Sequence, residues 1–355
     1  MLLPTSHPGV PRRSREEPAM PLRLLLAFML AMFMAPVAAQ AASFDCAKAS
    51  SPFEKAICSD PALSAQDEVL SVAYKTATGG LSKAASDVML KGQRDWLRFL
   101  DKVCADDMLP GQEKLEDERV SCLSSQYMTR IRALEGSRML GGLRIYQSDT
   151  YWAAPDPEGE SYYRVATATT TAPLIDGTGK EAKAFNAMIA DETADAVKGM
   201  GEEDASRTSS DTDLSLAVTN VNDARIDVEV TSYWFGHGAA HGNYGITYLH
   251  FLREEGRKLV ADDLFAGKSW NQNLADLTLK RLKEDRGELL WDIDAAWLKE
   301  AVADPARWKF DDGGLVIQFQ PYEVGSYAEG AITALIPWMQ LQDDLSEAGT
   351  SLTYN

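Results

Sequence analysis

The sequence predicts two domains, an all-α, disulfide-linked helical bundle followed by an α+β domain with an antiparallel sheet. Three observations support this fold class. All four cysteines fall within residues 44–135, where apolar residues recur at helical spacing. At about residue 140 the period changes to the alternation typical of strands. Beyond that point, strand and helix patterns are more segregated than alternating, as in α+β domains.

The first 41 residues have the pattern of a secretory signal peptide. A basic, polar start precedes an apolar run of 16 residues, Leu24 to Ala39, and Ala39-Gln40-Ala41 offers small residues for cleavage. The run is shorter than the roughly 20 residues that a spanning helix needs. We therefore expect cleavage near Ala41 rather than an uncleaved membrane anchor, and a periplasmic or secreted protein with no membrane segment. Met20 is an alternative start.

Residues 44–135 are predicted to form four helices. Two helix starts are marked by a capping residue before a proline, Ser51 before Pro52 and either Ser59 or Asp60 before Pro61. Two longer patterns follow at residues 86–104 and 122–136. The expected apolar stripe of the first is Leu90, Leu97, Leu100 and Cys104, widened by Trp96, Phe99 and Val103. That of the second is Leu123, Tyr127, Ile131 and Leu134. Short connections predict an antiparallel bundle of about 90 residues.

The four cysteines are expected to form disulfides, because their number is even and the chain is predicted to be exported. They are Cys46, Cys58, Cys104 and Cys122, which allow three pairings. Pairing Cys46 with Cys58 and Cys104 with Cys122 closes the shortest loops, and each bridge is worth roughly 3 kcal/mol. None lies in a C-x-x-C pair, which disfavours zinc and redox roles. We expect no metal and no cofactor.

Residues 136–144 are predicted to be a linker, and residues 145–345 the second domain. Ile226, Val228 and Val230 alternate with charged residues, as a one-sided antiparallel strand requires. Turn signals at Asn222-Asp223 and Glu255-Gly256 predict two hairpins. Helices are expected at residues 181–200, 271–286 and 294–303.

The net charge of the chain limits the classes of partner that we expect it to bind. Loss of residues 1–41 removes four arginines and two glutamates, so the formal net charge falls from −18 to about −20. Such a protein repels nucleic acid and anionic lipid, and we expect neither as a partner. It attracts basic proteins, and that attraction raises association rates by roughly 10–10³-fold at low salt. The alternative is that the acidity only keeps the protein soluble.

The first domain resembles the LprI-type lysozyme-inhibitor domain over residues 44–135. Its cysteines, caps and tryptophan fall in order in FDCAKASSPFEKAICSDPALSAQD, QRDWLRFLDKVC and CLSSQYMTRIRAL, which begin at Phe44, Gln93 and Cys122. The resemblance implies a small secreted helical domain with disulfides. The family name refers to inhibition of lysozyme, although many members have no assigned activity.

The second domain resembles the extracellular C-terminal domain of the anti-sigma factor RsiV, over about residues 145–340. The segments that carry the likeness are GAAHGNYGITYLHF, GRKLVADDLF and FQPYEVGSYAEGAITALIPW. In RsiV this domain binds lysozyme, and in the peptidoglycan deacetylase PdaC it accompanies the catalytic domain. The chain has no deacetylase domain, and 19 residues before Met20 are too few for an anti-sigma domain. We expect neither activity.

The stretch SYWFGHGAAHGNYG, Ser232 to Gly245, places His237 and His241 four residues apart. Its glycines disfavour a zinc-binding helix, and the spacing offers no third ligand. A catalytic imidazole needs a carboxylate partner, for which Asp211 and Asp227 are candidates. We expect a structural turn or a recognition loop, with Asn243 as a further contact. The adjacent Tyr233, Trp234 and Phe235 are expected in the core or on the sheet surface rather than in a ligand platform.

A second stretch, QPYEVGSYAEG, Gln320 to Gly330, is the stronger candidate for binding a partner. Tyr322 and Tyr327 are of the type favoured at interface hot spots. Glu323 is placed to meet an arginine, and Ser326 lies between the tyrosines. The alternative is that both tyrosines pack in the core.

These features predict an exported, non-catalytic protein that binds or inhibits lysozyme or another basic muramidase. A first alternative is a cell-envelope module that binds peptidoglycan or muropeptides, which aromatic rows in a cleft would favour. A second is a hydrolase built on His237 and His241.

Overall fold

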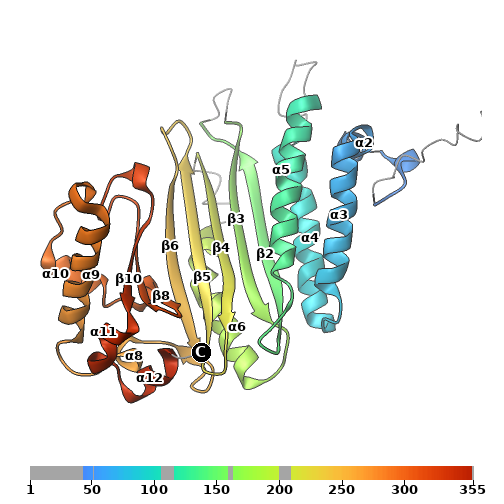
Figure 1. The fold of residues 1–355 in the computed structure, drawn as a ribbon. Coiled ribbons are helices and arrows are strands. Elements are labelled where there is room, and N and C mark those ends of the chain that lie inside the picture. The colour runs from blue at the N-terminus through green and yellow to red at the C-terminus, as the bar shows by residue number, and fades with distance from the viewer. Residues whose placement is uncertain (1–42, 51, 105–115, 159–162, 200–208, 354–355) are drawn as a thin grey trace, which may run out of the picture. The chain divides into compact units, whose positions relative to one another are not determined.

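The computed structural model describes residues 43–353, except residue 51 and segments 105–115, 159–162 and 200–208. It confirms the predicted fold class: a helical region with two disulfides precedes a region of mixed sheets and helices (Figure 1). The expected leader and its cleavage site lie outside the described residues. Among the residues described, no helix is long and apolar enough to cross a membrane.

The helical region is built from a short 3-10 turn and four helices. They are η1 (Cys46–Lys48), α2 (Pro52–Ser59), α3 (Pro61–Thr78), α4 (Lys83–Cys104) and α5 (Glu116–Glu135). Asp60 caps α3 as predicted, since its carboxylate accepts from the Leu63 amide at 2.8 Å. The disulfides Cys46–Cys58 and Cys104–Cys122 close the two shortest loops, as expected.

The predicted apolar stripe of α4 is wrong in part. Leu90 and Leu97 are 39% and 41% exposed, whereas Met89 and Trp96, one position earlier, are each 1% exposed. The physical reason is that α4 packs on strand β2 as well as on α5, so its buried face turns toward both neighbours. Gly92 lies on this face, where an added Cβ would be 3.6 Å from Asp149 of β2.

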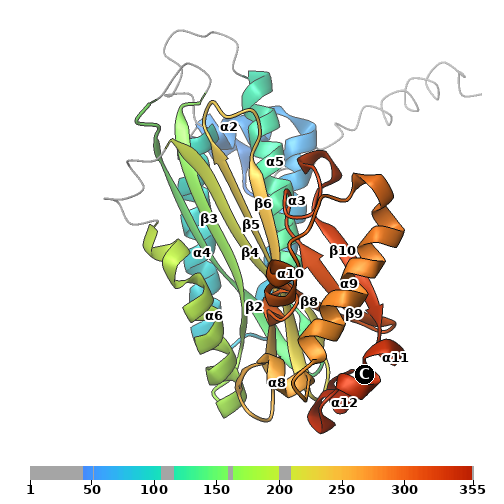
Figure 2. The same cartoon turned by 90° about the vertical axis from the view of Figure 1, so that its left-hand side faces the viewer.

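The main sheet has seven strands in the order β1-β2-β3-β4-β5-β6-β7. They are β1 (Met139–Leu140), β2 (Leu143–Pro155), β3 (Val165–Ile175), β4 (Ser210–Val221), β5 (Arg225–Gly236), β6 (Asn243–Leu252) and β7 (Arg257–Lys258). Among the described strands, only β3 and β4 pair in parallel, and α6 (Lys180–Gly199) lies between them in the chain. Helix α6 runs along one face of the sheet (Figure 2), where Phe185 and Ile189 pack on Leu216 and Val228. Strand β1 lies in the stretch expected to be a linker.

The C-terminal part adds a three-stranded sheet in the order β10-β9-β8. Its strands are β8 (Trp308–Asp311), β9 (Gly314–Phe319) and β10 (Ile332–Pro337), and its helices are α8 (Ala261–Leu264), α9 (Trp270–Arg286), α10 (Ala295–Ala301), α11 (Trp338–Leu341) and α12 (Glu347–Thr353). Leu274, Trp308, Phe319 and Leu341 are fully buried in its core. The expected helices at 271–286 and 294–303 are confirmed as α9 and α10.

A buried ion pair joins the helical region to the main sheet. Arg130 of α5 bonds Asp149 of β2, and both side chains are shielded from solvent. The same guanidinium donates to Gln93 at 3.0 Å and to the Tyr151 hydroxyl at 3.2 Å. Burial acts to lower the pKa of Arg130, but the interactions with Tyr151 and Asp149 outweigh burial. The pKa of Arg130 is therefore above its ordinary value.

Candidate functional site

The two loops singled out in the sequence come together in the structure. The His241 ring stacks on Tyr327, with centroids 4.0 Å apart, and Tyr327 stacks on Tyr322 at 5.2 Å. Nδ1 of His241 donates to the Gly242 carbonyl at 2.8 Å, which leaves Nε2 to accept from the Tyr322 hydroxyl at 3.3 Å. We call His241, Tyr322 and Tyr327 the aromatic cluster.

The loop that carries the tyrosines is fixed to the open edge of β6. Strand β7 pairs with β6 only at its end, which leaves the backbone of the first part of β6 free on that side. The Gln320 side chain bonds the amide and the carbonyl of Ile246, at 2.8 and 2.7 Å, as a neighbouring strand would. The Tyr327 hydroxyl donates to Gly242 at 2.6 Å, and Tyr244 accepts from the Ala331 amide at 2.9 Å. The loop is therefore rigidly held.

Tyr322 is placed at the surface by an unusual backbone conformation. Its φ is +70°, a value that no other non-glycine residue adopts in the described part of the chain. Such a conformation costs about 1–3 kcal/mol and persists only where neighbours enforce it. The side chain is 48% exposed in spite of its stacking on Tyr327. A strained backbone that presents a large aromatic side chain is typical of a binding site.

Glu323 faces into the loop and pairs with Arg307. Its two carboxylate oxygens each lie 2.7 Å from a guanidinium nitrogen of Arg307, and one also accepts from the Gln320 amide. Hydrogen bonding to Glu323 raises the pKa of Arg307 above its ordinary value, against the effect of burial. An arginine from a partner would compete with Arg307 for this carboxylate. Ser326 is exposed, and its amide donates to Glu329 at 3.0 Å.

Asn243 is exposed at the start of β6, opposite Trp234 of β5. Gly242 beside it lies under the Tyr233 ring, because an added Cβ would be 2.4 Å from the Tyr233 hydroxyl. Tyr233 and Trp234 are exposed on the sheet surface.

His237 lies apart from the aromatic cluster and is buried, with a side chain 5% exposed. Nδ1 bonds Asp156, Nε2 lies 3.3 Å from Asp211, and the ring stacks on Tyr163 at 4.7 Å. The Ser209 hydroxyl donates to Asp156 at 2.5 Å. Burial acts to raise the pKa of Asp156, but the bonds from Ser209 and His237 outweigh it and lower this pKa. His237 thus ties together the ends of β2, β4 and β5.

The positions of the two histidines disfavour a shared metal site and a hydrolase site built on both of them. His237 and His241 have different partners, and the described residues contain no group of three or more His, Cys, Asp or Glu placed to hold a metal. Ser209 bonds a carboxylate rather than an imidazole, whereas nucleophilic catalysis uses a hydroxyl bonded to the imidazole. The described geometry does not assemble a hydrolase triad.

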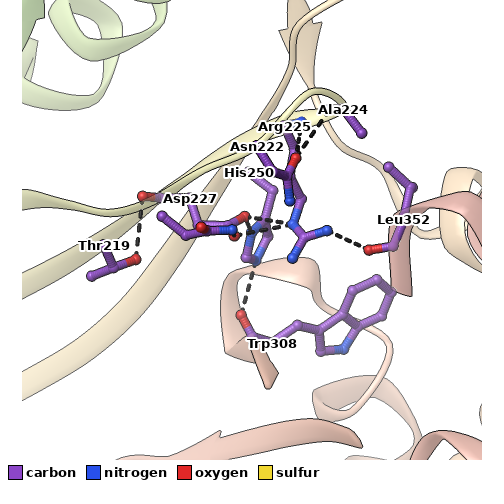
Figure 3. Close-up of polar contacts among 9 residues, drawn as sticks. Thr219, Asn222, Ala224, Arg225, Asp227, His250, Trp308 and Leu352 are labelled. Carbon is purple, nitrogen blue, oxygen red and sulfur yellow. Dashed lines mark hydrogen bonds and ion pairs between the residues drawn. The ribbon is translucent and has the colours of Figure 1, made fainter. Parts of the chain in front are cut away.

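A buried polar network lies between β5, β6 and the C-terminal part (Figure 3). The expected one-sided strand at residues 225–230 is therefore wrong in part, because Arg225 and Asp227 are buried under the C-terminal part. Asp227, the other carboxylate considered for the loop histidines, accepts from His250 at 2.7 Å and from Arg225 at 2.9 and 3.0 Å. His250 Nε2 faces the Trp308 carbonyl at 2.9 Å, and Arg225 donates to the Leu352 carbonyl. A signal was present, because Arg225 and Asp227 share one face of a strand.

The charge state of Asp227 depends on this network. Burial acts to raise its pKa, but hydrogen bonding and charge from His250, charge from Arg225 and a bond from Asn220 outweigh burial. The pKa of Asp227 is therefore below its ordinary value, and the carboxylate stays ionised inside the protein. This network fastens the C-terminal part to the hairpin that carries His241.

The helical region contains a separate hollow of about 450 Å³, lined by Phe53, Asp67, Tyr74, Trp96 and Tyr127 among others. The Tyr127 hydroxyl donates to Asp67 at 2.7 Å, and the Ser43 amide donates to the other oxygen at 2.8 Å. Burial, together with the negative charge of Asp67, raises the pKa of Tyr127 far above its ordinary value. Asp67 is therefore occupied by internal partners.

Comparison with known proteins agrees with both resemblances noted in the sequence. Residues 46–134 match the family model described as "Lysozyme inhibitor LprI", and residues 262–339 match "Protein of unknown function (DUF3298)". Neither family is described as an enzyme. The second match includes the tyrosine loop and the C-terminal sheet but not His241. No curated protein matches the chain.

Two solved structures of DUF3298 proteins are among those similar to this chain. One, from Bacteroides fragilis, is 16% identical with a TM-score of 0.44. The alignment covers 60% of this chain and 97% of the Bacteroides fragilis chain. Another, from Pseudomonas aeruginosa, is 12% identical with a TM-score of 0.42. The alignment covers 60% of this chain and 98% of the Pseudomonas aeruginosa chain. This chain is thus similar to the LprI family of lysozyme inhibitors over residues 46–134 and to the DUF3298 family over residues 262–339.

Proposed function

We propose that this protein is exported and inhibits basic, lysozyme-type muramidases by binding them, without catalysis of its own. The match of residues 46–134 to the lysozyme-inhibitor family carries the proposal. The two disulfides support export, because such bonds persist in oxidising compartments. The formal charge of −18 supports a basic partner through long-range attraction.

In the helical region, we assign the contact to the outer face of α3. Val69 and Val72 are 53% and 61% exposed, and they continue a helical stripe that starts at the exposed Ala62 and Ala65. Residues three and four apart lie on one side of a helix, so these four form an uncovered apolar face. Glu68 adjoins it on the surface. An apolar centre with an acidic edge suits the surface of a basic protein.

In the second region, we assign the contact to the aromatic cluster with Ser326; Asn243, paired with Trp234, lies on the opposite face of the hairpin. The loop is held in place before binding, and such preorganisation reduces the entropy lost on association. A lysozyme cleft holds two carboxyl groups, one protonated and one ionised. The Tyr322 hydroxyl and the His241 imidazole offer hydrogen bonds to groups of this kind. Glu323 supports the loop from behind through Arg307. His237 instead fixes the end of β5 through Asp156 and Asp211.

The test is titration of the mature protein into a c-type lysozyme digesting cell walls, at about 50 and about 300 mM salt. We expect inhibition that saturates at a fixed stoichiometry and persists at the higher salt. Replacing an interface hot spot costs about 2 kcal/mol or more, so Tyr322→Ala and the double change V69D/V72D should each weaken inhibition more than roughly tenfold. Met339→Ala, which removes a large exposed apolar side chain outside the tyrosine loop, is the control.

Two other outcomes of the inhibition test would change the conclusion. Inhibition that disappears at high salt would show that charge alone attracts the enzyme, and the proposal would fail. Loss of inhibition in V69D/V72D but not in Tyr322→Ala would place the contact in the helical region only.

A further inference from the structure

We propose a second binding site, a groove for an uncharged glycan between Trp152 and Trp234, on the face of the main sheet that carries α6. It goes beyond muramidase inhibition, because the aromatic cluster and the α3 face take no part in it.

The strand register places both indoles in one row across the sheet. Trp152 of β2 is opposite Ala168 of β3, Ala168 is opposite Thr212 of β4, and Thr212 is opposite Trp234 of β5. Directly paired residues point to the same face, and adjacent strands lie about 4.8 Å apart, so the two tryptophans start about 14 Å from each other. Only Ala168 and Thr212 stand between them. Small side chains therefore form the floor of a groove, and the two indoles form its sides.

The next row toward the strand ends is also low. It contains the pairs Ala154–Ala166 and Ser210–Gly236. An added Cβ on Gly236 would be 2.8 Å from the Trp234 indole, so the ring leans over this glycine. Trp234 remains 51% exposed, and Trp152 is half-buried.

Helix α6 closes the groove on one side. Asp195 and Ala196, near the end of α6, line it together with Ser210, Ser232 and the two tryptophans. The cavity measures about 430 Å³, within the range of roughly 300–1,000 Å³ that small-molecule sites occupy. Because α6 packs on the same face through Phe185 and Ile189, the groove continues the buried core outward to solvent.

The side chains in the groove suit a chain of pyranose sugars. Indole faces offer large flat apolar surfaces for the apolar faces of sugar rings, and the distance between the walls exceeds one ring. The hydroxyls of Ser210, Thr212 and Ser232 and the Asp195 carboxylate supply donors and acceptors for sugar hydroxyls. Asp195 and the formal charge of −18 disfavour an anionic ligand, so the glycan that fits is uncharged.

The groove and the aromatic cluster lie on opposite faces of one hairpin. Tyr233 and Tyr244 are cross-strand partners on the face away from Trp234, and Tyr244 packs edge-on against Tyr327 of the cluster. Side chains that alternate along a strand point to opposite faces. A change at Trp234 should therefore leave the cluster in place, so the two proposals can fail independently.

The experiment is calorimetric titration of the whole mature protein with two uncharged probes, tri-N-acetylchitotriose and cellotriose. We expect saturable binding of at least one probe and a Kd about tenfold higher in Trp234→Ala. Trp291→Ala, an exposed tryptophan outside the groove, should keep the parent Kd. Thr212→Phe fills the space between the walls while keeping both indoles, and it should block binding. Circular dichroism and thermal unfolding establish that each variant is folded.

Two results would overturn the proposal. One is no saturable binding of either probe at millimolar concentration by the folded parent protein. The other is unchanged affinity in both Trp234→Ala and Thr212→Phe. Muramidase inhibition by Trp234→Ala should equal that of the parent protein, so a failure here is distinguishable from a failure of the proposed inhibition.

Discussion

The links that stabilise the helical region and those that stabilise the sheet region span different distances along the chain. In the helical region the covalent cross-links are local: the disulfides join cysteines 12 and 18 residues apart, and Asp60 caps the helix that follows it. In the sheet region the polar links are remote, since Gln320 bonds a residue 74 positions away and Arg225 one 127 positions away. We therefore expect the loss of one link to cost the helical region less stability than it costs the C-terminal part.

The largest effect is expected from breaking the buried network with Asp227→Ala. This change leaves Arg225 and His250 buried without their shared carboxylate. Breaking a buried ion pair by removing one partner costs about 3–5 kcal/mol. Urea unfolding should show this loss, and Asp262→Ala, which removes an exposed carboxylate, is the control. A loss below about 1 kcal/mol would mean that the C-terminal part does not depend on this link.

The next largest effect is expected from removing a disulfide of the helical region. Replacing Cys104 and Cys122 by alanine should cost about 3 kcal/mol in the chain-entropy model, and replacing Cys46 and Cys58 about 0.4 kcal/mol less because their loop is shorter. Thermal unfolding of both double variants measures the difference. If the Cys46–Cys58 pair proved the more costly to remove, loop length would not be the deciding term.

A smaller effect is expected from pH. The pKa of Asp227, like that of Asp156, is lower in the folded protein than its ordinary value. Stability from such a group is complete above the unfolded pKa of about 3.9 and is lost as pH falls through the folded pKa. Unfolding free energy should therefore decline below about pH 4, and less steeply in Asp227→Asn. An equal slope in both proteins would show that Asp227 does not contribute.

Much of the fold was predictable because its signals are local. The cap at Asp60, the pairing of the cysteines and the alternation of Ile226, Val228 and Val230 each involve residues close in the chain. The stripe of α4 was misplaced because its second neighbour, β2, begins about 40 residues after the end of the helix, and helical period alone does not indicate it.

The candidate site was predictable only as two separate loops. Residue types singled out Tyr322, Tyr327 and His241, but their stacking joins positions 81 and 86 apart. The groove between Trp152 and Trp234 required the register of four strands, including the one parallel pair, which short-range turn signals do not encode.

The sequence by itself determined the helical and alternating segments and the acidic charge, since each depends on composition or on nearby residues. It left three cysteine pairings open, and the tertiary structure shows the one that closes the shortest loops. The tertiary structure decided which carboxylate each histidine meets: Asp156 and Asp211 for His237, and Asp227 for His250. It also decided that Gln320 completes the edge of β6. The physical reason is that such contacts form when remote strands pack, and their free energy depends on burial and geometry that exist only in the assembled fold.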